Sequence, residues 1–91
     1  MTLSEILIAA GVTPDDLHPD CKFIAQDWDG LTEEFLCKPL PFIGNNDWWA
    51  VDSRIKNSAN FGEIELASDL ETPLSREQFT ADYAAHQAAK Q

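Results

Sequence analysis

The stretch CKFIAQDWDGLTEEFLCKP, Cys21 to Pro39, decides the fold because two apolar runs flank a turn dipeptide, Asp29-Gly30. The runs Lys22 to Trp28 and Leu31 to Lys38 are rich in aromatic and aliphatic residues, as β-strands usually are. Asp-Gly tolerates the positive φ angles of a type I′ turn, so the stretch predicts a β-hairpin closed at that dipeptide. The cross-strand pairs that follow are Trp28 with Leu31, Ile24 with Phe35, and Phe23 with Leu36.

Helix signals lie on both sides of this hairpin. Thr2 to Glu5 fits a capping box before apolar residues at helical spacing, which predicts a short helix over residues 3–10. Thr13-Pro14-Asp15-Asp16 predicts a single helical turn that Thr13 caps. Near the C-terminus we expect a helix that begins after Ser75, with Gln78 completing a capping box and Leu74 packing on Phe79.

Two further segments are strand candidates. Trp48 to Val51 is a short aromatic run, and Glu63 to Ala67 alternates charged and apolar residues, which is typical of a half-exposed edge strand. Pro39 and Pro41 should end the second hairpin strand, and residues 52–60 are polar enough to form a loop. We therefore predict one α+β domain over residues 1–91, with an antiparallel sheet of three to four strands, a short N-terminal helix, and a C-terminal helix packed on one face.

The charge of the chain is strongly negative, with 16 acidic against 6 basic residues and a formal net charge of −10. Nucleic acid and anionic lipid bind through clusters of lysine and arginine, and the sequence contains no such cluster. We therefore expect no direct binding to nucleic acid or to a membrane. The N-terminal apolar run is interrupted by Glu5 and has no basic residues before it, so we expect a cytoplasmic protein.

Metal, redox and catalytic sites are weakly supported by the residue spacing. Of His18, Cys21, Cys37 and His86, only the first two have the close spacing of a zinc ligand pair, so we expect no metal and no disulfide. Asp27 and Asp29 resemble the start of a calcium loop, but Lys38 occupies the position of its final glutamate. At a solvent-exposed hairpin tip the carboxylates of Asp27 and Asp29 should both stay ionised, and an ionised carboxylate cannot act as a general acid. We expect no cofactor and no enzymatic activity.

Trp48 and Trp49 are the most informative aromatic residues. Adjacent residues of a strand point to opposite faces of a sheet, so the two rings cannot enter the same core. One of them fills the core, and the other either anchors a protein interface with Trp28 and Phe42 nearby or is covered by the following loop.

Several stretches together resemble a known group of proteins: FIAQDWDG with its A-x-D-x-D-G pattern, the aromatic pair in DWW, and the helix start in LETPLSREQF. The chain is similar over about residues 21–80 to small accessory proteins encoded by tailed phages and prophages of enteric bacteria. It departs from that group in its opening helix and at Leu70, where a tryptophan is common. The resemblance implies a host-takeover or anti-defence role, in which some acidic inhibitors occupy surfaces that bind DNA or RNA.

The function predicted from charge and resemblance together is binding and inhibition of a basic host protein, such as a nucleic-acid-binding defence enzyme that a DNA mimic would block. The alternative is a self-associating structural module, a homodimer with an aromatic interface. Long-range attraction would act through the acidic residues near the hairpin, and the aromatic pair would supply the contact. The predicted partner-binding residues are Asp15, Asp16, Asp20, Asp27, Asp29, Glu33, Glu34, Trp48 and Trp49.

Overall fold

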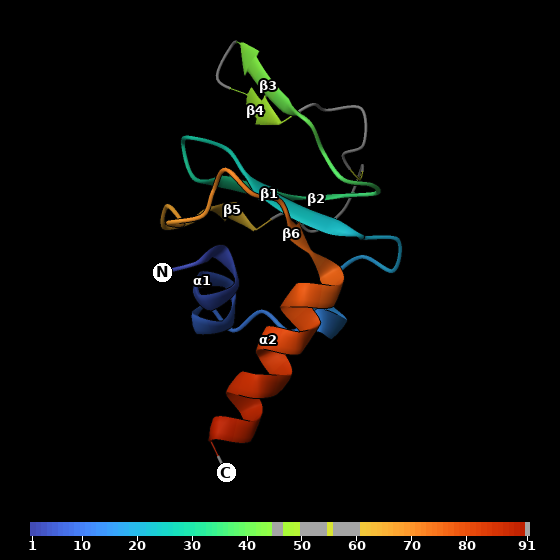
Figure 1. Cartoon of the computed structure of the whole chain (residues 1–91), viewed down its shortest axis with the longest axis vertical. Helices are drawn as coiled ribbons and strands as arrows, with labels where there is room; N and C mark the ends of the chain where they lie inside the picture. Colours follow the sequence, from blue (N-terminus) through green and yellow to red (C-terminus); the bar gives the residue numbers. More distant parts are fainter. Residues whose placement is uncertain (45–46, 50–54, 56–60, 91) are drawn as a thin grey trace.

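The computed structural model describes residues 1–44, 47–49, 55 and 61–90, and places helices on one side of a central sheet and a separate hairpin on the other (Figure 1). The predicted α+β class is confirmed. In chain order the elements are α1 (Leu3–Ala9), the 3-10 turn η1 (Pro14–Asp16), β1 (Phe23–Gln26), β2 (Leu31–Phe35), β3 (Pro41–Gly44), β4 (Asp47–Trp49), β5 (Gly62–Glu63), β6 (Leu74–Ser75) and α2 (Arg76–Ala89).

The central sheet is antiparallel, with the strand order β5-β2-β1-β6. The two long strands of the predicted hairpin, β1 and β2, form its middle, and the edge strands β5 and β6 are only two residues long. Strands β3 and β4 pair with each other in a second, two-stranded sheet. The sequence patterns did not predict β6, because Leu74 and Ser75 were assigned to the start of the helix.

The register of the hairpin differs from the predicted one by one residue. The observed pairs are Phe23 with Phe35, Ile24 with Glu34, Ala25 with Glu33, and Gln26 with Thr32. The Gly30 N–H donates to the Asp27 carbonyl at 3.0 Å, and the Asp27 N–H donates to the Leu31 carbonyl at 2.8 Å. Gly30 has a φ of +94°, so the connection is a turn over Trp28, Asp29 and Gly30 with a glycine bulge, rather than a two-residue type I′ turn.

The two faces of this hairpin contribute to different hydrophobic clusters. The larger cluster joins Ile24 of the sheet to the helices, with Leu7 of α1 and Phe79 of α2 fully buried in it. The smaller cluster contains Ala25 and Phe35, with Phe23 packed against them. Because side chains alternate along a strand, the helices cover one face of the sheet, and the face with Phe23, Ala25 and Phe35 is opposite.

The helix caps are largely as predicted. Thr2 and Glu5 form the capping box of α1, and at the start of η1 the N–H and hydroxyl of Thr13 both donate to the Asp16 carboxylate. The Ser75 hydroxyl accepts the Gln78 N–H at 3.0 Å, so the predicted start of α2 is confirmed. The expected capping box on Gln78 does not form, because its side-chain amide donates to Asp82 Oδ1 at 2.8 Å.

Of the predicted strand Trp48 to Val51, the first two residues belong to β4, and residues 50 and 51 lie outside the described residues. The strand predicted over Glu63 to Ala67 is shorter than expected, because β5 contains Glu63 but not the residues after it. The chain after β5 is held by a side chain instead of a strand. The Gln26 amide donates to the Glu65 carbonyl and accepts the Ala67 N–H, both at 2.8 Å. Pro41 begins β3 rather than following a strand end, and the loop predicted over residues 52–60 lies, apart from Ile55, outside the described residues.

Candidate functional site

Three of the predicted acidic residues lie in the segment between α1 and β1. Asp15, Asp16 and Asp20 are all exposed. The Asp16 carboxylate accepts the Thr13 N–H at 2.8 Å and so also has a local structural role. Asp20 Oδ2 lies 4.0 Å from His18 Nδ1, and the Asp20 N–H donates to that nitrogen at 3.0 Å. Asp15 and Asp20 thus remain available to a partner.

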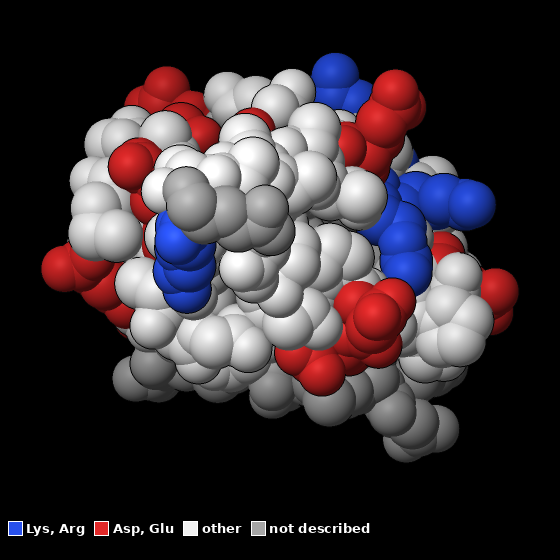
Figure 2. All heavy atoms as spheres, turned by 90° about the horizontal axis from the view of Figure 1, so that it is seen from below, with Lys and Arg blue, Asp and Glu red and all other residues white. Residues whose placement is uncertain are grey.

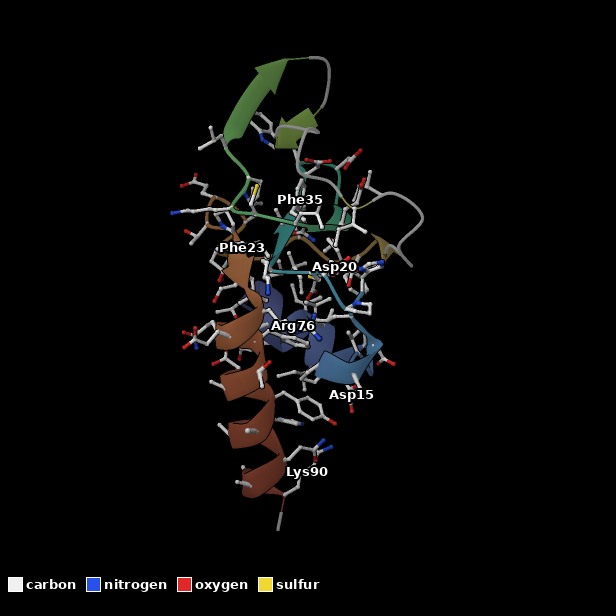
Figure 3. All side chains as sticks on the ribbon, turned by 90° about the vertical axis from the view of Figure 1, so that its right-hand side faces the viewer. Asp15, Asp20, Phe23, Phe35, Arg76 and Lys90 are labelled. Atoms are coloured by element: carbon white, nitrogen blue, oxygen red, sulfur yellow. The ribbon has the colours of Figure 1, made fainter. Side chains whose placement is uncertain are left out.

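Arg76 fixes this acidic segment against α2, and Figure 3 shows its side chain reaching toward the segment that carries Asp15. Arg76 Nη1 donates to the His18 carbonyl at 2.8 Å and to the Cys21 carbonyl at 3.1 Å, and Nη2 donates to the Pro14 carbonyl at 3.4 Å. The half-buried guanidinium therefore satisfies backbone acceptors inside the molecule. The sequence analysis did not identify this role of Arg76. Its position directly after the Ser75 cap makes it the first residue of α2.

Glu34 was predicted to bind a partner, and the structure places it in the interior with 1% of its surface exposed. Its Oε1 accepts the His18 N–H at 2.8 Å. Its Oε2 is buried and has no hydrogen-bond partner among the described residues. The prediction is wrong because Glu34 pairs with Ile24 in the observed register and shares the helix-facing side of the sheet.

Asp27 and Glu33 are buried as well, which contradicts their predicted place on a partner-binding surface. Both have interactions within the structure. Glu33 pairs with Ala25 on the other face of the sheet, and the Asp27 backbone closes the turn through two hydrogen bonds. Glu33 and Glu34 point to opposite faces of the sheet, and both are buried because hydrophobic clusters lie on both faces.

The two cysteines are free thiols in different surroundings. Cys21 is fully buried and donates to the Phe23 carbonyl at 3.4 Å. Burial raises the pKa of the Cys21 thiol to about 11, and the nearby Glu34 carboxylate adds to this rise. A thiol that stays protonated is a poor nucleophile and a poor metal ligand, so Cys21 acts as a core residue near neutral pH. Cys37 is exposed.

The turn at the hairpin tip presents Trp28, whose side chain is 58% exposed. The Asp29 carboxylate accepts the Leu31 N–H at 3.0 Å, and the Thr32 hydroxyl donates to the Gly30 carbonyl at 3.0 Å. The Ile64 N–H also donates to the Gly30 carbonyl, at 3.0 Å. These bonds hold the tip in one conformation, with Trp28 and Asp29 on its outer side.

The segment Ser68 to Glu71 lies beside this turn and is fixed at several points. Both the N–H and the hydroxyl of Ser68 donate to the Met1 carbonyl, at 2.8 and 3.0 Å. The Asp69 carboxylate accepts the Leu3 N–H at 2.8 Å and so links the segment to the start of α1. Between the turn and this segment is a hollow of about 370 Å³, which we call the Trp28 hollow; it is lined by Trp28, Ser68, Leu70 and Glu71.

A second hollow, of about 620 Å³, lies between α1 and α2. Its two carboxylates already make local contacts. Glu5 accepts the Thr2 N–H at 2.8 Å, which lowers the pKa of Glu5, and Asp82 accepts the Gln78 amide. Glu71 in the Trp28 hollow differs from both, because within the described part of the chain its carboxylate makes no hydrogen bond or ion pair.

The exposed charges are spread over the molecule. On the face seen in Figure 2, acidic side chains lie in several separate places, and so do lysine and arginine side chains. Asp15 and Asp20 precede β1 whereas Asp29 follows it, so the strand separates the exposed predicted residues into two groups. The structure does not bring them together into one site. The side chains of Trp48 and Trp49 lie outside those that the structure describes.

In the ranges 1–44, 47–49, 55 and 61–90, no three histidine, cysteine or acidic side chains are placed to hold a metal ion. No helix in the same ranges is long and apolar enough to cross a membrane. Comparison with known proteins found no matching family model, no matching curated protein and no matching solved structure.

Proposed function

We propose that this chain is a non-enzymatic acidic protein that binds a basic protein in the cytoplasm and blocks its surface. The observation that carries the proposal is the net charge of −10 on a domain with a radius of gyration of 12.5 Å. Small soluble domains usually have net charges of magnitude about 2–8. A charge of this size attracts a basic surface over long range and accelerates its association.

The placement of the charged groups supports this proposal. Asp15, Asp20 and Asp29 are exposed, and the exposed Glu65 and Glu71 extend the acidic surface beyond the predicted residues. Arg76 is directed toward backbone carbonyls and, within the described residues, forms no ion pair with these carboxylates. The partner that fits best is a basic surface of the kind that binds nucleic acid, and the resemblance to phage accessory proteins suggests a host defence enzyme.

The experiment is affinity capture from bacterial lysate with the whole chain as bait, at about 50 and about 500 mM salt. The Debye length falls from about 14 Å to about 4 Å over this range, so a partner held by charge should be retained only at low salt. The double variant Asp15→Asn/Asp20→Asn should retain less of it. The matched control Asp15→Glu/Asp20→Glu keeps both charges and should retain as much as the unchanged protein.

Two results would count against the proposal. One is the absence of any basic protein retained at low salt, and the other is equal retention by the neutralised and the charge-preserving variants.

Self-association is the second candidate function, and the observation that favours it is the exposure of Leu36 at 47% and of Leu40 at 69%. Sedimentation of the free protein tests it, since a dimer that dissociates in Leu36→Ser/Leu40→Ser would identify these side chains as the interface.

A further inference from the structure

We propose that the Trp28 hollow binds an arginine side chain of the partner. This inference rests on the proposed function, because it specifies where the basic partner docks and which of its residues is recognised. The hollow brings together an exposed aromatic ring, an aliphatic wall, a hydroxyl and a carboxylate, from Trp28, Leu70, Ser68 and Glu71 respectively. No other part of the described surface combines a hollow, an exposed tryptophan and a carboxylate without a local contact.

Both walls of the hollow are held in place before any ligand arrives. The turn is closed by the Gly30–Asp27 hydrogen bond and by the Asp29 carboxylate, and the Ile64 N–H joins it to the following segment. The opposite wall is fixed by Ser68 on the Met1 carbonyl and by Asp69 on Leu3. A site that does not need to be ordered on binding loses less affinity to conformational entropy.

The chemistry of the lining fits a long cationic side chain. An arginine has an aliphatic stem that packs on Leu70 and a planar guanidinium that stacks on an indole ring. The Glu71 carboxylate accepts hydrogen bonds from the guanidinium and balances its charge. The Ser68 hydroxyl hydrogen is already donated to the Met1 carbonyl, so its oxygen is left as an acceptor that faces a donor-rich ligand.

Other occupants fit less well. A phosphate or a carboxylate would be repelled by Glu71 and by the net charge of the chain. A purely apolar side chain would remove the Glu71 carboxylate from water without giving it a partner. A lysine meets the charge requirement, but its compact, strongly hydrated ammonium stacks less well on an aromatic ring than a guanidinium does. The volume of about 370 Å³ suits one side chain rather than a folded element.

The test is a titration of the isotope-labelled whole chain with hexa-arginine peptide at about 50 mM salt, followed by NMR. We expect the indole N–H signal of Trp28 and the amide signals of residues 68–71 to shift. Glu71→Gln should weaken binding about two- to five-fold. The control Glu77→Gln removes the same charge from an exposed site on α2 and should weaken binding less than about two-fold.

The role of the ring is tested separately with Trp28→Leu. This variant should bind hexa-arginine about two- to five-fold more weakly, which is the effect of a cation–π contact at an exposed site. The unchanged protein should prefer hexa-arginine to hexalysine, and Trp28→Leu should lose most of that preference. The exposed positions of Trp28 and Glu71 make loss of folding unexpected, and the amide spectra of the free variants check it directly.

The outcomes separate this inference from the proposed function. If Glu71→Gln and Glu77→Gln bind equally and Trp28→Leu keeps its arginine preference, the hollow is not the site, while charge-driven binding still stands. Shifts centred on Trp48 and Trp49 instead of Trp28 would also overturn it. If hexa-arginine does not bind at all, the hollow is rejected, and the lysate capture decides separately whether a basic partner exists.

Discussion

Gly30 meets two steric requirements at one position of the hairpin tip. Its φ of +94° lies in the left-handed region, which other residues enter at a cost of about 1–2 kcal/mol. A Cβ atom at this position would also lie 2.6 Å from the Ile64 carbonyl oxygen, which is backbone and cannot turn away. Glycine is therefore needed both for the turn that presents Trp28 and for the packing of the next segment on that turn.

We predict that Gly30→Ala lowers the free energy of unfolding by roughly 2–4 kcal/mol, because backbone strain and steric overlap add. Gly11→Ala is the matched control. Gly11 has a similar φ of +87°, but no atom lies within 4 Å of a Cβ built there, so only the strain of about 1–2 kcal/mol should be lost. Urea denaturation measures both values. Equal losses for the two variants would show that Ile64 does not restrict this position.

At the scale of secondary structure, the sequence predicted the elements better than their alignment. The capping residues Thr2 and Ser75 and the apolar runs around Asp29-Gly30 determine local geometry, so α1, α2 and the central hairpin were predicted correctly. The register of the hairpin was predicted wrongly, because Asp-Gly is compatible both with a two-residue turn and with a turn that ends in a glycine bulge. The choice depends on the contact of Gly30 with Ile64, 34 residues further along, which no local pattern contains.

Arg76 joins two elements that are far apart in the sequence. Its backbone N–H donates to the Lys22 carbonyl at 2.8 Å at the start of β1, while its guanidinium binds carbonyls of the preceding acidic segment. α2 also contacts that segment through η1. The position of Asp15 and Asp20 relative to the sheet therefore depends on a side chain of α2.

We predict that Arg76→Met lowers the free energy of unfolding by about 1–3 kcal/mol, since the partly buried carbonyls of His18 and Cys21 lose their donors. Arg76→Lys should recover only part of this loss, because an ammonium cannot reach three carbonyls in the way that a guanidinium fork does. Lys22→Met removes an equal charge at an exposed position and should change stability by less than about 0.5 kcal/mol. Denaturant unfolding compares the three, and amide exchange should show faster opening at Asp16 and Cys21 in Arg76→Met. A loss no larger than that of Lys22→Met would contradict the assigned role.

Across the whole molecule, the location of the candidate site could be predicted only in part. The net charge indicated the kind of partner that we propose, and Trp28 was considered only as a neighbour of Trp48 and Trp49. Its exposure depends on how the segment from Ile64 to Glu71 returns to the hairpin tip, which the Gln26 amide and the Ser68–Met1 contacts determine. These side-chain to backbone bonds have no periodic pattern in the sequence, so the hollow could not be predicted from it.

The same excess of negative charge should act in opposite directions on folding and on binding. At low ionic strength, like charges repel one another within the folded chain, so its net charge of −10 destabilises the compact state. We predict that the thermal midpoint rises between about 10 and about 200 mM sodium chloride, because the Debye length falls from about 30 Å to about 7 Å. The affinity for hexa-arginine should fall over the same range. Asp15→Asn/Asp20→Asn should weaken both responses, whereas Asp15→Glu/Asp20→Glu should leave them unchanged, and calorimetry measures midpoint and affinity on the same samples. A midpoint that falls with added salt would show that attractive ion pairs, rather than repulsion, dominate the electrostatics of this fold.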